Sequence, residues 1–280
     1  MVQQDKSHRK VRKVKEGPNF SGQHFLHDKR VIHELMKAAK ITSTDTVLDI
    51  GAGRGAISFP LAERAGRVIA IEYDEKLAEY LLEKSTVYPG LKVIQQNILD
   101  YRLPKEPFCV VSNIPYSITT SIMKKLLSNP QNKLQRAALV LEKGAAKRFT
   151  ASPIMDPTIL VWRMWFDIKV LCTIPRDKFS PIPRVDAALL LATRRDTPLV
   201  QPQHHRLFAA LATYALSYPR APLIDVFRGI FTPGQMKHLL RNIGAHREQP
   251  VYMLTAAQWG KIFNTMLKYV DRARWPRLKK

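Results

Sequence analysis

The sequence predicts an α/β protein, in which a doubly wound, largely parallel sheet is followed by a small unit made only of helices. Short apolar runs alternate with amphipathic segments over the first two thirds of the chain, as in strands joined by crossover helices. Runs of consecutive apolar residues, such as CVVS and ALVL, are typical of strands that are covered on both faces. From residue 204 onward we find only helical periodicity.

The elements follow in order along the chain. A helix is expected from about Asp28 to Lys40, with Asp28 as its N-cap. Strands are expected at Thr46–Ile50, Arg67–Tyr73, Leu91–Ile98, Phe108–Ser112, Ala137–Leu141, Ile168–Ile174 and Ala187–Thr193. Helices are expected between them at Ala56–Ala65, Glu75–Thr86, Ile118–Ser128, Lys143–Thr150 and Thr158–Phe166. The last helices are expected at Arg206–Ser217, Pro222–Arg228, Pro233–Ile243 and Thr255–Tyr269, with Thr232 and Thr255 as caps.

Composition shifts divide the chain into three parts. Residues 1–18 are basic and poor in apolar side chains, which predicts a disordered arm that grips phosphates; a solubilising tail and a mitochondrial presequence are the alternatives. Residues 19–196 carry the alternating pattern, and a proline-containing linker, Thr197–Pro202, follows. Residues 197–280 are interpreted as a helical RNA-binding domain.

The chain has 280 residues and a formal net charge of +22. Positively charged side chains in such excess repel one another, which predicts a polyanionic partner. Nucleic acid is the first candidate, and an acidic membrane surface is the second. No apolar run approaches the ~20 residues that span a bilayer, so no membrane partner is expected. Cys109 and Cys172 lie in apolar runs, which predicts two buried reduced thiols and a cytoplasmic protein. The histidines show no ligand spacing, and no metal is expected.

A glycine-rich turn marks the first candidate site. The apolar run Val47–Ile50 breaks into Gly51-Ala52-Gly53-Arg54-Gly55, as in a buried strand that ends in a tight turn before a helix. Alternate glycines let the backbone approach a ligand where a Cβ would clash, and the helix N-terminus offers free N–H groups. We therefore expect a nucleotide-type cofactor across this turn.

The spacing of the glycines favours one cofactor over another. A dinucleotide site usually reads G-x-G-x-x-G, whereas here the third glycine comes one residue early. Glu72, at the end of the second strand, is placed to accept hydrogen bonds from both hydroxyls of a ribose. The pattern favours S-adenosylmethionine over NAD, and a plain structural turn is the third interpretation.

The tetrapeptide Asn113-Ile114-Pro115-Tyr116 directly follows a predicted strand. The exocyclic amine of adenine is a poor nucleophile because its lone pair is delocalised into the ring, so both of its N–H groups must be held. The Asn113 oxygen and the Ile114 carbonyl, stiffened by Pro115, can accept them. Tyr116 offers a stacking face worth ~1–3 kcal/mol, and catalysis by alignment and electrostatics requires no metal. The structural alternative is a strand that ends in a proline turn.

Several segments together carry a specific resemblance over nearly the whole chain: SGQHFL at 21–26, DIGAGRG at 49–55, AIEYD at 70–74, QQNIL at 95–99, NIPYSIT at 113–119, EKGAAKRF at 142–149 and KFSPIPRVD at 178–186. The chain resembles the rRNA adenine N6-methyltransferases, most closely their erythromycin-resistance (Erm) branch. The resemblance implies a Rossmann-like, S-adenosylmethionine-dependent methyltransferase domain. It further implies mono- or dimethylation of one adenine of 23S rRNA before full ribosome assembly, by a monomer, with resistance to macrolides, lincosamides and streptogramin B.

The resemblance also implies roles for particular residues. Residues expected around the cofactor are Gln23, His24, Leu26, Gly51, Gly53, Glu72, Tyr73, Asn97, Ile98 and Asn113. Residues expected to hold the target base are Asn113, Ile114, Pro115 and Tyr116, with Phe179 as a second stacking wall.

Two positions depart from the family pattern. The family generally has Asp where Asn97 stands, and it often has Asn where His24 stands. An Asn oxygen still accepts a hydrogen bond from the cofactor's amino group, so weaker binding is expected at residue 97. The contact made by residue 24 stays open.

Two rival functions share the predicted fold. The first is a housekeeping dimethylase of the small-subunit rRNA, and Ile114 together with the basic helical end favours the resistance branch over it. The second is a nucleic-acid-binding protein that does not methylate, and the intact tetrapeptide 113–116 argues against that interpretation.

Overall fold

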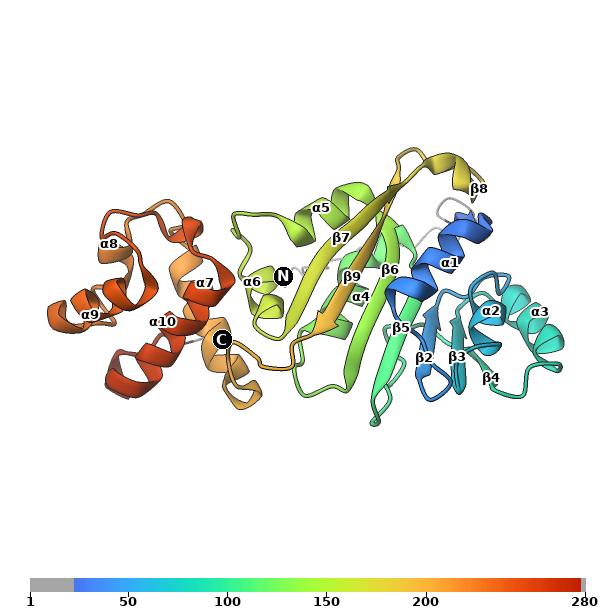
Figure 1. Cartoon of the computed structure of the whole chain (residues 1–280), viewed down its shortest axis with the longest axis horizontal. Helices are drawn as coiled ribbons and strands as arrows, with labels where there is room; N and C mark the ends of the chain where they lie inside the picture. The colour runs from blue at the N-terminus through green and yellow to red at the C-terminus, as the bar shows by residue number, and fades with distance from the viewer. Residues whose placement is uncertain (1–22, 278–280) are drawn as a thin grey trace, which may run out of the picture.

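A seven-stranded sheet in the order β4-β3-β2-β5-β6-β9-β7 forms the centre of the computed structural model, which describes residues 23–277 (Figure 1). The strands β4, β3, β2, β5 and β6 are parallel, and β9 runs antiparallel to both β6 and β7. The predicted doubly wound, largely parallel sheet is thus confirmed. The strands are β2 Thr46–Ile50, β3 Arg67–Glu72, β4 Leu91–Gln95, β5 Phe108–Asn113, β6 Leu134–Glu142, β7 Phe166–Ile174 and β9 Ala187–Arg194.

The helices cover the two faces of the sheet because neighbouring strand residues point to opposite sides. Val47 belongs to a core with Leu35, whereas the next residue, Leu48, belongs to a core with Ile122. Both strand side chains are completely buried. The helices of this part are α1 Lys29–Ala38, α2 Ser58–Ala62, α3 Glu75–Ser85, α4 Thr119–Leu127, α5 Lys143–Thr150 and α6 Pro157–Arg163.

The described elements after residue 200 are all helical, as the periodicity predicts. Thr232 and Thr255 each form a capping box at the start of a helix, and Gly244, with φ +64°, ends α9. The four α-helices are α7 His205–Leu216, α8 Leu223–Phe227, α9 Pro233–Ile243 and α10 Ala256–Tyr269.

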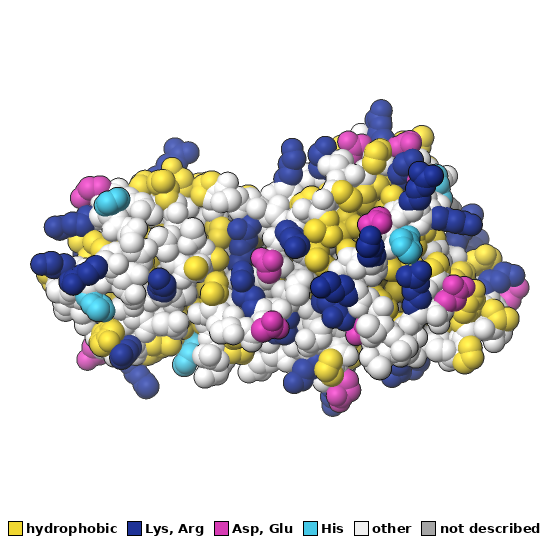
Figure 2. All heavy atoms as spheres, viewed as in Figure 1, with side chains coloured by type: hydrophobic (Ala, Val, Ile, Leu, Met, Phe, Trp, Pro, Cys, Tyr) yellow, Lys and Arg dark blue, Asp and Glu magenta, His cyan; other side chains and the backbone are white. Residues whose placement is uncertain are grey.

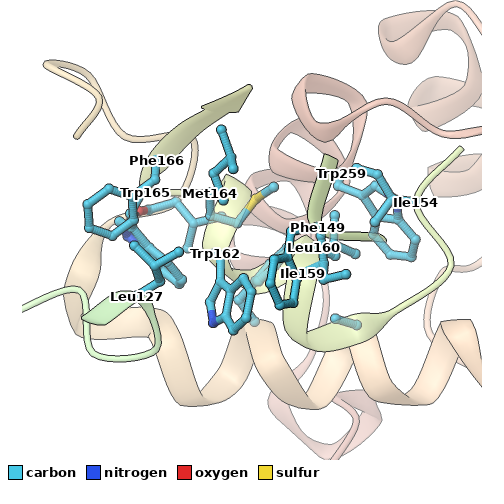
Figure 3. Packing of buried hydrophobic residues seen from close by; sticks show 14 of the residues in the cluster. Leu127, Phe149, Ile154, Ile159, Leu160, Trp162, Met164, Trp165, Phe166 and Trp259 are labelled. Carbon is cyan, nitrogen blue, oxygen red and sulfur yellow. The ribbon is translucent and has the colours of Figure 1, made fainter. Parts of the chain in front are cut away.

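Large aromatic side chains join the helical end to the sheet (Figure 3). Trp165 meets Phe208 of α7 edge-on at 6.4 Å between ring centroids, and its indole donates to the Val200 carbonyl at 2.8 Å. Trp259 of α10 is completely buried in the same cluster. One continuous core includes residues from both sides of the expected domain boundary at 196/197. The division into two domains there therefore stays a prediction.

A short two-stranded sheet lies beside the main one. Its strands, β1 (Phe25–Leu26) and β8 (Phe179–Ser180), pair antiparallel, so the segment that precedes α1 is fastened to a loop far along the chain. The Asp28 side chain then caps α1 by accepting from Arg30 and Val31, as predicted.

Some expected details are wrong. Cys172 is exposed, because β7 forms the edge of the sheet, whereas Cys109 is buried as predicted. Strand β4 ends at Gln95 and helix α6 at Arg163, and α2 is shorter than expected. The basic arm, residues 1–18, lies outside the described residues. Within residues 23–277, no helix combines the length and the hydropathy that crossing a membrane requires.

Candidate active site

The glycine turn after β2 has the backbone that its sequence predicts. Gly51, Gly53 and Gly55 have φ values of +71°, +56° and +80°, in the left-handed region that only glycine enters without strain. A Cβ on Gly51 would lie 3.1 Å from the ring of Pro115. The turn therefore packs directly against the tetrapeptide 113–116, which follows β5.

Glu72 joins the end of β3 to this turn. Its side chain is 5% exposed. One carboxylate oxygen accepts from the Gly53 amide at 2.7 Å, and the other accepts from Tyr73 and Asp74 at 2.8 and 2.9 Å. A carboxylate offers about four acceptor positions, so some capacity is left for a ligand hydroxyl.

Asp49 is a buried carboxylate that holds neighbouring elements of the site together. Its two carboxylate oxygens accept from the Ser58 hydroxyl at 2.7 Å and the Ser112 hydroxyl at 3.0 Å. Complete burial raises its pKa to about 7, against the hydrogen bonds from the serines. The bonds link β2 to the start of α2 and to the residue that precedes Asn113.

Asn113 has one half of its amide satisfied and the other half free. Its Nδ2 donates to the backbone carbonyl of His24 at 2.8 Å, which fixes the orientation of the amide. Its Oδ1 is buried and accepts no hydrogen bond from any described residue. A buried acceptor without a partner costs ~1–3 kcal/mol, so this atom is suited to an incoming N–H donor.

Tyr116 and His24 form one wall of the pocket. Their ring centroids are 5.7 Å apart with an interplanar angle of 42°, and His24 Nδ1 lies 2.7 Å from the Pro181 carbonyl oxygen. The Tyr116 hydroxyl is buried without a partner among the described residues. Burial, and then the charge of Glu142, raises the pKa of Tyr116 to about 12, so the phenol stays protonated.

Two adjoining hollows share Gln23, Gly51, Glu72 and Pro115 as walls. The first lies against the tetrapeptide and is completed by His24, Phe25, Gly53, Asn113, Ile114 and Tyr116. The second, of about 510 Å³, reaches Tyr73, Asn97 and Ile98 and has the size of a ligand pocket. The residues predicted at the carboxyl ends of the strands thus meet at one edge of the sheet.

Phe179 does not lie where we expected it. Its side chain is 1% exposed and packs in the core opposite Leu26, so it provides no stacking wall for a base in this structure. Leu26 is itself mostly buried and lines only a smaller hollow beside Gly51 and Gly53. The pairing of β1 with β8 buries both side chains.

Asn97 uses the oxygen expected to face the cofactor in a local hydrogen bond. Its Oδ1 accepts from the Leu99 amide at 2.9 Å in the turn after β4. An amide oxygen has two lone pairs, so one acceptor position is left for the cofactor's amino group.

The sequence suggests Phe25 only as part of an apolar lid over the cofactor, together with Leu26, and assigns it no position in the pocket. Its ring lines the first hollow, and a Cβ on Gly53 would lie 2.9 Å from it. The signal was its place between Gln23 and Leu26, two residues that were themselves assigned to the site.

The sheet, the left-handed glycine turn and the carboxylate that ends the next strand define a class: a Rossmann-like methyltransferase. Gly51, Gly53, Glu72 and Asn113 line one pocket, and the Asn113 oxygen is buried without a partner among the described residues, so the residues present fit S-adenosylmethionine and an amine acceptor.

Comparisons with known proteins narrow this class. The family described as ribosomal RNA adenine dimethylase matches residues 15–268. An rRNA adenine N-6-methyltransferase of Bacillus licheniformis is 48% identical over 95% of this chain and 92% of its own length. A ribosomal RNA small subunit methyltransferase A of Streptococcus mutans is 32% identical over 72% of this chain and 73% of its own length. The chain belongs to the ribosomal RNA adenine dimethylase family.

Solved structures agree on the fold. The crystal structure of the 23S rRNA methyltransferase ErmE superposes with a TM-score of 0.77 at 24% identity and covers 87% of this chain and 100% of its own. A dimethyladenosine transferase from Plasmodium falciparum has a TM-score of 0.70 at 21% identity, with 87% and 98% covered.

Proposed function

We propose that this enzyme transfers methyl groups from S-adenosylmethionine to the N6 of one adenine in 23S rRNA, and that it thereby confers resistance to macrolides, lincosamides and streptogramin B. The substrate is proposed to be large-subunit rRNA before full ribosome assembly, and the enzyme a cytoplasmic monomer. The segments shared with the Erm branch support the 23S target. The chain is 48% identical to the rRNA adenine N-6-methyltransferase of Bacillus licheniformis and 32% identical to the small-subunit enzyme of Streptococcus mutans.

When bound, S-adenosylmethionine supplies a methyl group that is activated by a positively charged sulfur. Gln23 and His24 would close over its methionine end, and Glu72 would hold its ribose. Tyr73, Asn97 and Ile98 would line the adenine. Each of these six residues borders at least one of the two adjoining hollows.

The target adenine is proposed to leave its stack and to lie against Tyr116. Asn113 Oδ1 would accept one N–H of its amine, and the Ile114 carbonyl would accept the other. This arrangement directs the nitrogen lone pair toward the methyl donor, and the amine loses a proton to solvent. The observation that carries the proposal is the buried Asn113 oxygen, which has no partner within residues 23–277 and whose amide is held in place by a hydrogen bond to the His24 carbonyl.

Labelled methyl transfer to two substrates tests the proposal. We expect deproteinised 23S rRNA to accept label at one mapped adenine, and small-subunit particles to accept none. Label on the small subunit alone would establish the first rival instead. RNA binding without transfer by the unmodified enzyme would establish the second, a nucleic-acid-binding protein.

A further inference from the structure

A separate hollow lies between α8 and α9 in the helical end of the chain. These helices lie at the opposite end of the molecule from β2 and its glycine turn (Figure 1). The hollow has a volume of about 670 Å³ and is bounded by α8, α9 and the loop that follows α9. Its floor is apolar and consists of Ile224, Phe231, Met236 and Leu240. Phe231 is 2% exposed and Met236 3%, so these two side chains support the floor from the core. Half-buried Ile224 and exposed Pro233 give the hollow its accessible apolar surface.

The rim of this hollow is cationic. Arg228, Lys237 and Arg247 line it and are exposed, and His246 lies beside them. None of the three forms an ion pair within residues 23–277. No carboxylate lines the hollow, although Asp225 and Glu248 are close in sequence. On the face shown in Figure 2, lysine and arginine side chains project at several places from this end of the molecule.

The backbone around the rim is held in place. The Arg247 carbonyl accepts from the Ile224 amide at 3.2 Å, and the Ala245 amide donates to Leu240 at 3.1 Å. Gly244 in the left-handed region turns the chain from α9 into this loop. Ala245 and Pro233, at the start of α9, both line the hollow, so this part of its wall is preformed.

We propose that this hollow takes an unpaired nucleobase of the RNA substrate, while Arg228, Lys237 and Arg247 contact the flanking phosphates. This inference rests on the proposed function and adds a second anchor point for the same RNA. An apolar floor with unpaired cations at its rim matches a nucleotide, which has a flat apolar base and an anionic backbone. A rim that held phosphates alone would need no concave apolar floor.

The test measures binding of a deproteinised 23S rRNA fragment in which single bases are removed one at a time. For the unmodified enzyme we expect one unpaired position, apart from the methylated adenine, where loss of the base weakens binding about tenfold. Ala245→Leu narrows the hollow without adding charge. This variant is expected to bind intact RNA about tenfold more weakly and to be indifferent to the base at that position.

The charge of the rim is tested separately. Lys237→Gln with Arg247→Gln should weaken binding and lower the salt dependence of log K by roughly 1.4, since each phosphate on a single strand contributes about 0.7. Arg220→Gln with Arg241→Gln is the matched control, because both residues are exposed in the same helical end and neither lines the hollow. Cofactor affinity and the melting temperature check that every variant is folded.

Two failures are distinguishable. Suppose that the unmodified enzyme methylates 23S rRNA and that Ala245→Leu remains as sensitive as the unmodified enzyme to the loss of every base. The hollow then holds no base, and the inference is overturned. Equal losses in the rim variant and its control would also overturn it. If the unmodified enzyme methylates no rRNA, the proposed function fails, while the binding experiment still decides the role of the hollow.

Discussion

The two halves of the pocket at the sheet edge differ in how their polar groups are satisfied. In the half beside Glu72, a buried carboxylate already accepts three backbone amides, so its position is fixed before any ligand arrives. In the half beside Asn113, an amide oxygen and the Tyr116 hydroxyl are buried with no partner in the described chain.

Under the proposed function, the half beside Glu72 binds the cofactor rigidly, and the substrate completes the half beside Asn113. Satisfied hydrogen bonds hold the glycine turn in one conformation. Unsatisfied atoms cost free energy that an incoming donor recovers, so they favour a ligand that brings an N–H group to that place. Placement of acceptors for charge that develops during reaction is a strong source of catalysis.

The largest effect is expected from Asn113→Ala. Methyl transfer should fall by about 10²–10³, as when other preorganised polar groups are removed from active sites. Affinity for RNA and for cofactor should stay within about twofold, since the lost oxygen acts on the reacting amine. Single-turnover rates together with separate binding titrations measure this. A loss of RNA affinity as large as the loss of rate would contradict the catalytic role.

Asp49→Asn tests the buried carboxylate that supports both halves of the pocket. The pKa of this buried carboxyl is raised from 3.8 to about 7, so between these values the folded chain keeps a proton that the unfolded chain has lost. The free energy of unfolding therefore decreases as pH rises through this window, by up to ~1.4 kcal/mol per pH unit from this group. Urea titrations from pH 4 to 7 should show a shallower dependence for Asp49→Asn. Parallel curves for the two proteins would count against the assigned burial.

Glu72→Gln weakens the satisfied half. The change removes the negative charge that accepts hydrogen bonds from three backbone amides. Hydrogen bonds to charged groups contribute ~1.5–3 kcal/mol, so we expect the dissociation constant of the cofactor to rise about ten- to a hundredfold. Glu75→Gln is a matched control because Glu75 is exposed at the start of α3. Equal cofactor affinity in both variants would mean that Glu72 does not bind the cofactor.

Tyr116 separates stacking from hydrogen bonding. Tyr116→Ala should raise the KM for RNA by about tenfold, from a stacking contribution of ~1–3 kcal/mol. Tyr116→Phe keeps the ring and removes a hydroxyl that has no partner in the part of the chain that the structure describes. Activity should therefore persist, and the free energy of unfolding should rise by up to about 1 kcal/mol. If Phe were as damaging as Ala, the hydroxyl itself would have a role in the reaction.

The smallest effect is expected from Asn97→Asp. The Asn97 oxygen already accepts from Leu99, whereas a carboxylate has a second oxygen for the cofactor's amino group. Isothermal titration with S-adenosylmethionine should show severalfold tighter binding, of the order of 1 kcal/mol. Unchanged or weaker binding would mean that residue 97 does not face that amino group.

The sequence predicts the site best where it is built from local backbone. The glycine turn, Glu72 and the tetrapeptide 113–116 each lie at the end of a strand, so the strand pattern and the residue types suffice to place them. Contacts between distant segments escaped prediction. The bond from Asn113 to His24, and the burial of Phe179 against Leu26, both depend on the pairing of β1 with β8, which no periodicity announces.

The sequence also did not reveal which strand lies at the edge of the sheet. Apolar runs indicated strands that are buried on both faces, and this holds for β2 and β5 in the middle of the sheet. It fails for β7, where Cys172 is exposed, because the order of strands is set by long-range pairing of β9 between β6 and β7.

The most direct test is a crystal structure of the enzyme with S-adenosylhomocysteine and an RNA fragment that contains the target adenine. The account predicts an unstacked adenine against Tyr116, with its exocyclic nitrogen within hydrogen-bond distance of Asn113 Oδ1, about 2.7–3.2 Å. An adenine that enters this pocket with its amine turned away from Asn113 would contradict the central claim.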